Sequence, residues 1–219
     1  MIENTVFDRT GHDNPDLTAN AYNAIIGLTL FWGFLVNWMM VINIDVAALQ
    51  SINPWVFYGG YFASCIAGIM LFTKSSKPFY SFVGYNLVVI PFGTIIALVL
   101  ADYDKAIISE AIRLTGAVTA VMMILGSIFP TFFKGIGRAL LFALLAVIIV
   151  EMIEVFILGI HHDFLDWVVV VIFSGYIGYD WARANSIPRT VDNAIDSAAA
   201  LYMDIINLFL RLVRILGRK

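Results

Sequence analysis

The sequence predicts an all-α membrane protein with seven transmembrane helices. Of its 219 residues, 61% are hydrophobic and only 13% are charged, which is about half the charged fraction of an ordinary soluble domain. Seven apolar stretches also follow one another, each near the length of about 20 residues that a helix needs to cross a bilayer. A single cysteine, Cys65, permits no intramolecular disulfide, and we expect its thiol to be inert.

The seven expected spans are joined by short loops. They cover 21–44, 54–73, 79–101, 106–129, 137–159, 164–180 and 193–216. Residues 1–20 form a short polar N-terminal tail, in which "DNPD" (13–16) has the pattern of a helix start. Because no loop has room for a soluble domain, we expect residues 21–219 to form a single transmembrane domain.

The charges in the loops predict the orientation of the chain. The loops after the second, fourth and sixth spans carry most of the basic residues, namely Lys74, Lys77, Lys134, Arg138, Arg183 and Arg189. The positive-inside rule places these loops, and with them the N-terminus, in the cytoplasm. A seventh crossing would put the basic end "RILGRK" outside, against that rule. Either the last segment is re-entrant or its arginines serve packing and anchoring, and we favour the full crossing.

A polar stripe runs along the last expected span. Its members recur every three or four residues and so share one helix face: Asn193, Ser197, Ala200, Asp204, Asn207, Arg211 and Arg214. Carboxylates inside a membrane are costly and usually functional, so we favour a functional role for Asp204 over a hydrogen-bonded stripe that only joins helices. We expect Arg211 and Arg214 to anchor the helix end at the membrane surface.

Two motifs near the end of the chain resemble those of a known family. The stretch "ALYMDIINLFLRLVRILG" contains Asp204 and resembles the terminal signature of the transmembrane Bax inhibitor motif family. The stretch "GYD", which ends at Asp180, matches that family's Tyr-Asp pair at the end of the preceding helix. Here Trp181 and Ala182 replace the Thr-Gln that follows the pair in bacterial relatives. The resemblance implies six helices wrapped around a central C-terminal helix.

The resemblance also implies a role for the two aspartates. In the family, the residues that match Asp180 and Asp204 form a hydrogen-bonded pair that senses pH and gates a calcium leak. Two carboxylates in contact where little water reaches cannot both ionise cheaply, so they share one proton. Oxygen ligands of this type suit Ca²⁺. We therefore expect the pair to hold Ca²⁺ transiently, with Asn193, Ser197 and Asn207 lining the pathway.

Four further charged residues are candidates for supporting roles. Lys74 or Lys77 would be the basic latch that stabilises the closed form in related proteins, although a plain cytoplasmic anchor explains them equally well. Glu151 and Glu154 lie one turn apart on one helix face. They would form an acidic mouth that concentrates cations, or else face lipid headgroups or a partner helix.

Other pairs favour simpler interpretations. Glu110 and Arg113 are expected to form an intrahelical ion pair at the membrane surface. Adjacent residues on a helix point about 100° apart, so His161 and His162 do not predict a structural metal site. Ser174-Gly175 lacks a histidine in the next span to act as base, and we expect no enzymatic activity.

The sequence therefore favours a pH-sensitive calcium leak channel. Two alternatives stay open: a non-conducting regulator that binds a membrane protease or a cell-death partner, and a proton-coupled cation exchanger using the same aspartates. The expected partners are the lipid bilayer, Ca²⁺ as the permeant ion and, for the regulator, another membrane protein. We expect no cofactor and no nucleic acid. The expected location is the plasma (inner) membrane of a bacterium.

Overall fold

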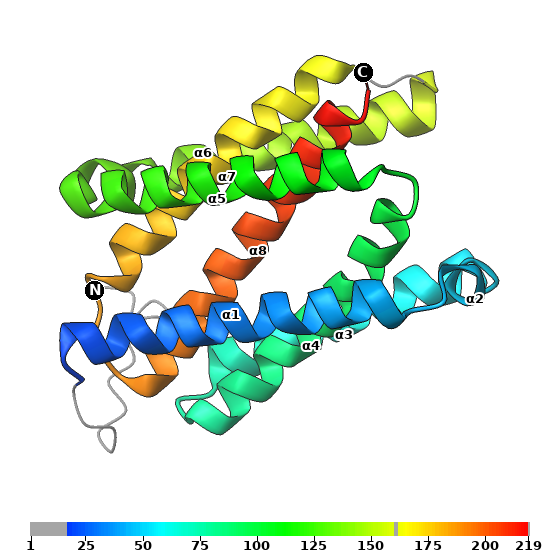
Figure 1. Cartoon of the computed structure of the whole chain (residues 1–219). Coiled ribbons are helices and arrows are strands. Elements are labelled where there is room, and N and C mark those ends of the chain that lie inside the picture. Colours follow the sequence, from blue (N-terminus) through cyan, green and yellow to red (C-terminus); the bar gives the residue numbers. More distant parts are fainter. Residues whose placement is uncertain (1–16, 160–161, 219) are drawn as a thin grey trace. The chain divides into compact units, whose positions relative to one another are not determined.

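The computed structural model describes residues 17–159 and 162–218, and every regular element in these ranges is a helix (Figure 1). The elements are α1 (Ala19–Asn43), α2 (Val46–Gln50), α3 (Pro54–Lys74), α4 (Pro78–Leu100), α5 (Lys105–Ile128), α6 (Pro130–Ile153), the π-helical turn η1 (Glu154–Leu158), α7 (Asp163–Ala184) and α8 (Val191–Leu216). The helix start expected at residues 13–16 lies outside the described residues.

Six of these helices are long and apolar enough to cross a membrane: α1, α3, α4, α5, α6 and α7. This confirms the prediction of an all-helical, multi-pass membrane protein. The last helix, α8, is 26 residues long but is not one of the six. It differs from them in carrying five charged residues, namely Asp192, Asp196, Asp204, Arg211 and Arg214.

Prolines and capping side chains determine where several helices begin. The side chain of Asn53 accepts a hydrogen bond from the backbone N–H of Trp55, just before Pro54 opens α3. Pro130 likewise opens α6. The fifth span was expected at 137–159, and this prediction is wrong at its start, whereas its end agrees with η1, which ends at Leu158. The helix starts seven residues earlier, because Pro130 favours a first helical turn that hydropathy overlooks, and it gives way to η1 after Ile153.

The helices form two compact units. Of the described residues, the first unit contains 17–102 and 186–202, and the second contains 103–159, 162–185 and 203–218. The single helix α8 therefore contributes its first half to one unit and its second half to the other. In the first unit α4 packs against α1, α2 and α3, whereas in the second unit α7 packs against α5 and α6.

Buried tyrosines join the helices of the first unit. Tyr202 on α8 donates a hydrogen bond to Oδ1 of Asn37 on α1 over 2.5 Å, and Tyr85 on α4 donates to the backbone carbonyl of Thr29 over 2.9 Å. Both rings are fully buried. Each hydroxyl therefore has the partner that a buried polar group requires, and the rings fill the space between the helices.

Close backbone contact holds α7 against α5 in the second unit. A Cβ atom built on Gly126 would lie 2.7 Å from the carbonyl oxygen of Gly178, so only glycine allows this approach. One turn further along, the indole N–H of Trp181 donates to Oγ of Ser127 over 2.8 Å. These contacts determine the position of the last turns of α7, which carry Asp180.

Candidate functional site

Asp180 and Asp204 meet in the second unit. Asp180 lies one turn before the end of α7, and its carboxyl group is within hydrogen-bonding distance of the carboxyl group of Asp204 on α8. Asp204 is only 7% exposed. Within the described part of the chain, no N–H or O–H group donates to its Oδ2 atom. A buried polar atom without a partner is costly, and a hydrogen shared between the two carboxyl groups provides one.

Aromatic and basic side chains of α7 surround this pair. Tyr176 lies one turn before Asp180 and close enough to interact electrostatically with both aspartates. Arg183, one turn after Asp180, interacts with its carboxyl group. The Arg183 guanidinium also lies 5.9 Å from the centre of the Tyr179 ring, a cation–π contact. The pair thus has one positive charge beside Asp180, whereas Asp204 faces mainly the other carboxyl group.

The two carboxyl groups alone supply fewer oxygen ligands than Ca²⁺ normally takes. Ca²⁺ normally takes six to eight oxygen ligands, whereas the described residues contain no group of three or more His, Cys, Asp or Glu side chains that could hold a metal. Transient contact of a passing cation with Asp180 and Asp204 is compatible with this arrangement and stays a prediction.

The polar stripe of α8 is engaged in hydrogen bonds. The hydroxyl of Tyr22 donates to the backbone carbonyl of Asn193 over 3.3 Å and is 3.2 Å from Oγ of Ser197. The side-chain amide of Asn193 also donates to the carbonyl of Pro188. Half-buried Asn207 donates to the Met203 carbonyl one turn earlier. These contacts give Asn193 and Ser197 a packing role in the first unit, and their role in lining a pathway stays a prediction.

Lys74 and Lys77 lie at the junction of α3 and α4. Lys74 is in the last turn of α3, and Lys77 immediately precedes Pro78, the first residue of α4. Both side chains are exposed, and neither forms an ion pair with a described residue. The latch predicted from the family resemblance therefore stays a prediction.

A cluster of six charged side chains includes a buried aspartate, Asp166, that is not among the candidates predicted from the sequence. Asp166 on α7 is fully buried. Its carboxylate oxygens form ion pairs with guanidinium nitrogens of three arginines, at 2.6 Å for Arg211, 3.3 Å for Arg214 and 2.7 Å for Arg218. Arg211 also binds Glu151 on α6 through both terminal nitrogens, at 2.5 and 2.9 Å. Arg218 binds Asp163 over 2.7 Å.

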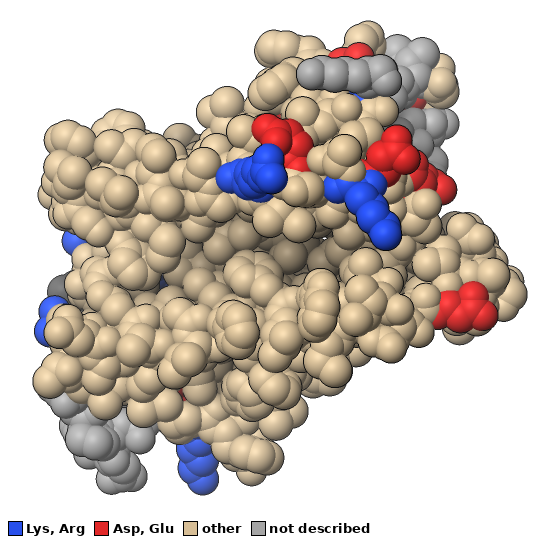
Figure 2. Space-filling view, in the orientation of Figure 1, with Lys and Arg blue, Asp and Glu red and all other residues tan. Residues whose placement is uncertain are grey.

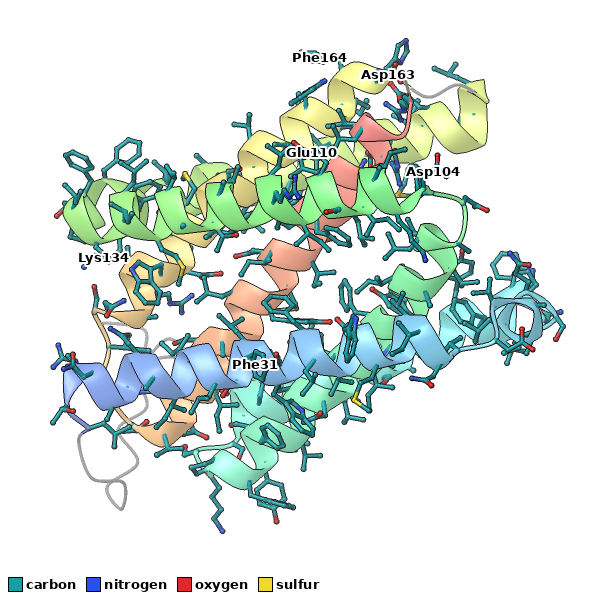
Figure 3. The ribbon with its side chains drawn as sticks, viewed as in Figure 1. Phe31, Asp104, Glu110, Lys134, Asp163 and Phe164 are labelled. Atoms are coloured by element: carbon teal, nitrogen blue, oxygen red, sulfur yellow. The ribbon has the colours of Figure 1, made fainter. Side chains whose placement is uncertain are left out.

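We refer to these six residues, Glu151, Asp163, Asp166, Arg211, Arg214 and Arg218, as the ionic cluster. Figure 3 shows Asp163 at the start of α7, beside the C-terminal end of α8. The Arg211 side chain is only 18% exposed and is bound by carboxylates of the protein, and its role as an anchor at the membrane surface stays a prediction. The signal for Asp166 was its position fourteen residues before Asp180 on the same helix, a spacing close to four turns.

The remaining acidic candidates also have partners. Glu151 belongs to the ionic cluster, and the carboxylate of Glu154 lies 2.5 Å from Nδ1 of His162. A common acidic mouth stays a prediction, but Arg211 balances the charge of Glu151 within it. The predicted pair of Glu110 and Arg113 is confirmed at 3.8 Å. His161 lies outside the described residues. On the face shown in Figure 2, charged side chains form small patches among the uncharged residues drawn in tan.

The helices and the buried carboxyl groups define this chain as a multi-pass membrane protein with ionisable groups inside its helical units. The family model described as "Inhibitor of apoptosis-promoting Bax1" (Bax1-I) matches residues 16–219. The chain belongs to this family, as the motifs around Asp180 and Asp204 predict.

Bacterial proteins resemble the chain over most or part of its length. An uncharacterized membrane protein of Streptococcus pyogenes serotype M1 is 26% identical over 100% of this chain and 99% of its own length. An uncharacterized protein of Helicobacter pylori strain J99 is 26% identical over 74% of this chain and 71% of its own. The inner membrane protein YbhL of Escherichia coli K12 is 25% identical over 58% of each chain.

We predict that Asp166→Ala strongly destabilises the protein. Removing one partner of a buried ion pair leaves the others uncompensated and costs about 3–5 kcal/mol. The free energy of unfolding in mixed detergent micelles measures this loss. Glu110→Ala is the matched control, because its partner is exposed and such pairs contribute about 0–1 kcal/mol. Equal effects of the two substitutions would contradict a stabilising role for the cluster.

Proposed function

We propose that the chain forms a passive, pH-regulated pathway for cations, with Ca²⁺ as the permeant ion and with Asp180 and Asp204 as sensor and gate. One observation supports this proposal above the others. The two carboxyl groups lie in contact, and among the described residues no N–H or O–H group donates to Oδ2 of Asp204. A proton held between the two carboxyl groups completes the hydrogen bonding of this atom, so the pair is sensitive to proton concentration.

The physical chemistry of the pair connects pH to movement. While the two carboxyl groups share one proton, they attract each other through a charge-assisted hydrogen bond. When that proton leaves, two negative charges face each other where the dielectric constant is low, and the repulsion is strong. The turns of α7 and α8 that carry them then separate, or a cation enters between them. Carboxylate oxygens are the ligands that a hard cation such as Ca²⁺ prefers.

The proposal includes α8 as a seventh crossing, surrounded by the other six helices. A helix of 26 residues is about 39 Å long, which exceeds the hydrocarbon thickness of about 30 Å. Most of its residues are buried, including Ala198, Leu201 and Val213 at 1% exposure or less. Its charged residues then lie inside the protein rather than against lipid, as intramembrane charges usually do. The membrane is the inner membrane of a bacterium, with the N-terminus in the cytoplasm.

Two engineered cysteines test this topology. In a Cys65→Ala background, Asp102→Cys places a thiol in the loop before α5, and Asn185→Cys places one after α7. Three crossings separate these sites, so a membrane-impermeant maleimide applied to intact cells should label position 102 and leave position 185 unlabelled until the cells are lysed. Labelling of both sites, or of position 185 alone, would contradict the proposed orientation.

The function itself is tested in liposomes that contain the purified full chain and a trapped Ca²⁺ indicator. We expect Ca²⁺ entry whose rate changes between mildly acidic and neutral pH, and we expect Asp204→Asn to flatten this profile because an amide cannot release the shared proton. A change of 1.4 kcal/mol in the free-energy difference between the closed and open states changes the ratio of their populations by about tenfold. Asp104→Asn, which alters an exposed aspartate at the start of α5, is the control and should keep the native profile.

Three other outcomes would contradict parts of this proposal. A native pH profile in Asp204→Asn would show that this residue is not the pH sensor. Transport that stops when the proton gradient is abolished would identify an exchanger, because a leak requires no counter-ion. Absence of Ca²⁺ entry at every pH would favour the regulator that binds another membrane protein.

A further inference from the structure

The ionic cluster and the aspartate pair lie on one antiparallel helix contact. Fourteen residues separate Asp166 from Asp180 on α7, and fourteen also separate Asp204 from Arg218 on and just after α8. Asp180 faces Asp204, and Asp166 faces Arg218 at 2.7 Å. Equal spacing on two antiparallel helices gives both pairs the same register, about 21 Å apart along the helix.

The two ends of this contact differ in chemical character. At the cluster, three guanidinium groups meet three carboxylates, one of which is fully buried. Arginine does not lose its proton in proteins, so the positive charge at this end does not change over the pH range in which carboxyl and imidazole groups titrate. At the other end, the contact depends on a proton that the pair gains or loses. One end is therefore permanent, and the other is variable.

Arg211 links three helices at the permanent end. Its guanidinium binds Glu151 on α6 with both terminal nitrogens and Asp166 on α7 with one of them. Such forked geometry is directional as well as strong, so it restricts both sliding and rotation of α8. Seven residues, close to two full turns, separate Arg211 from Asp204. A restriction on the orientation of Arg211 is thus also a restriction on the orientation of Asp204.

We propose that the ionic cluster sets the register of α8 on α7 and thereby holds Asp204 opposite Asp180. Arg211 and Asp166 are then positioning residues for the proton-sharing pair, through which they act without contacting it. This inference rests on the proposed function for its consequence, but the positional claim stands on the contacts alone. Loss of the cluster allows α8 to slide or turn, and the carboxyl groups no longer meet.

Cross-linking tests the positional claim without any transport assay. In the full-length Cys65→Ala protein, Asp180→Cys and Asp204→Cys place two thiols at the pair, and a short bifunctional maleimide joins them. We expect efficient joining with Arg211 present and a several-fold lower yield in Arg211→Met. Arg211→Lys retains the charge and should recover part of the yield. Arg113→Met, which removes an exposed arginine on α5, is the control and should leave the yield unchanged.

An unchanged yield in Arg211→Met would overturn the proposal. If that variant does not elute as a folded protein in detergent, Arg218→Met decides by the same criterion, because it removes the register partner of Asp166 and leaves Arg211 and Arg214 in place.

The transport assay separates this inference from the proposed function. With both aspartates present, Arg211→Met should shift the pH midpoint of Ca²⁺ entry, whereas Arg211→Lys should remain close to the native profile. A lower cross-linking yield together with no Ca²⁺ entry in the unaltered protein would support the positioning role and refute the channel. A native pH profile in Arg211→Met would count against the positioning role.

Discussion

Two aspartates buried in the same unit have opposite electrostatic surroundings, since one faces arginines and the other faces a carboxyl group. The behaviour we propose depends on this difference. Asp166 has three guanidinium groups around it, so its charge is balanced by groups that do not titrate. Asp204 has another carboxyl group as its main neighbour, and a proton shared between the two carboxyl groups reduces their combined charge. Burial of charge costs free energy in both places. At Asp166 the arginines offset this cost at every pH at which the carboxyl group is ionised. At Asp204 the cost is offset only while the pair holds a proton.

The helix α7 carries one residue of each arrangement, namely Asp166 of the ionic cluster and Asp180 of the aspartate pair. The contact between Gly126 and Gly178 brings α5 against α7 near Asp180, and the Trp181–Ser127 hydrogen bond holds the next turn. Near the other end of α7, the ionic cluster joins α6, α7 and α8. A change of protonation at Asp180 and Asp204 therefore acts on helices that are restrained close by, and the strain it creates is concentrated at the pair.

Hydropathy was enough to predict most of the fold. Apolar length identified α1 and the helices from α3 to α7 because a bilayer imposes a minimum span, whereas the five-residue helix α2 was not predicted. It failed at α6, whose first turns contain Lys134 and whose start depends on Pro130 rather than on apolar content. The sequence motif selected Asp180 and Asp204 as candidates because both residues carry a recognisable local signature, and the structure places their carboxyl groups within hydrogen-bonding distance.

Asp166 and its arginines were harder to predict for a physical reason. An acidic residue in the first turn of a helix is ordinary, because it complements the helix dipole, and Asp166 lies in that turn of α7. Its partners are 45 residues or more away in the chain, so no local pattern joins them. Arg211 and Glu151 are 60 residues apart in the chain, so no local pattern predicts their pairing either. The position of Arg211 near a helix end predicted a surface anchor instead.

The central claim is that Asp180 and Asp204 hold one proton between them. Infrared difference spectroscopy of the purified protein in detergent tests it most directly, through the carbonyl stretch of protonated carboxylic acids at neutral pH. We predict such an absorption in the unaltered protein and its loss when Asp180→Asn and Asp204→Asn are combined, because the double variant lacks both carboxyl groups, with Asp104→Asn unchanged. An absorption that survives both substitutions, or that is absent from the unaltered protein, would contradict it.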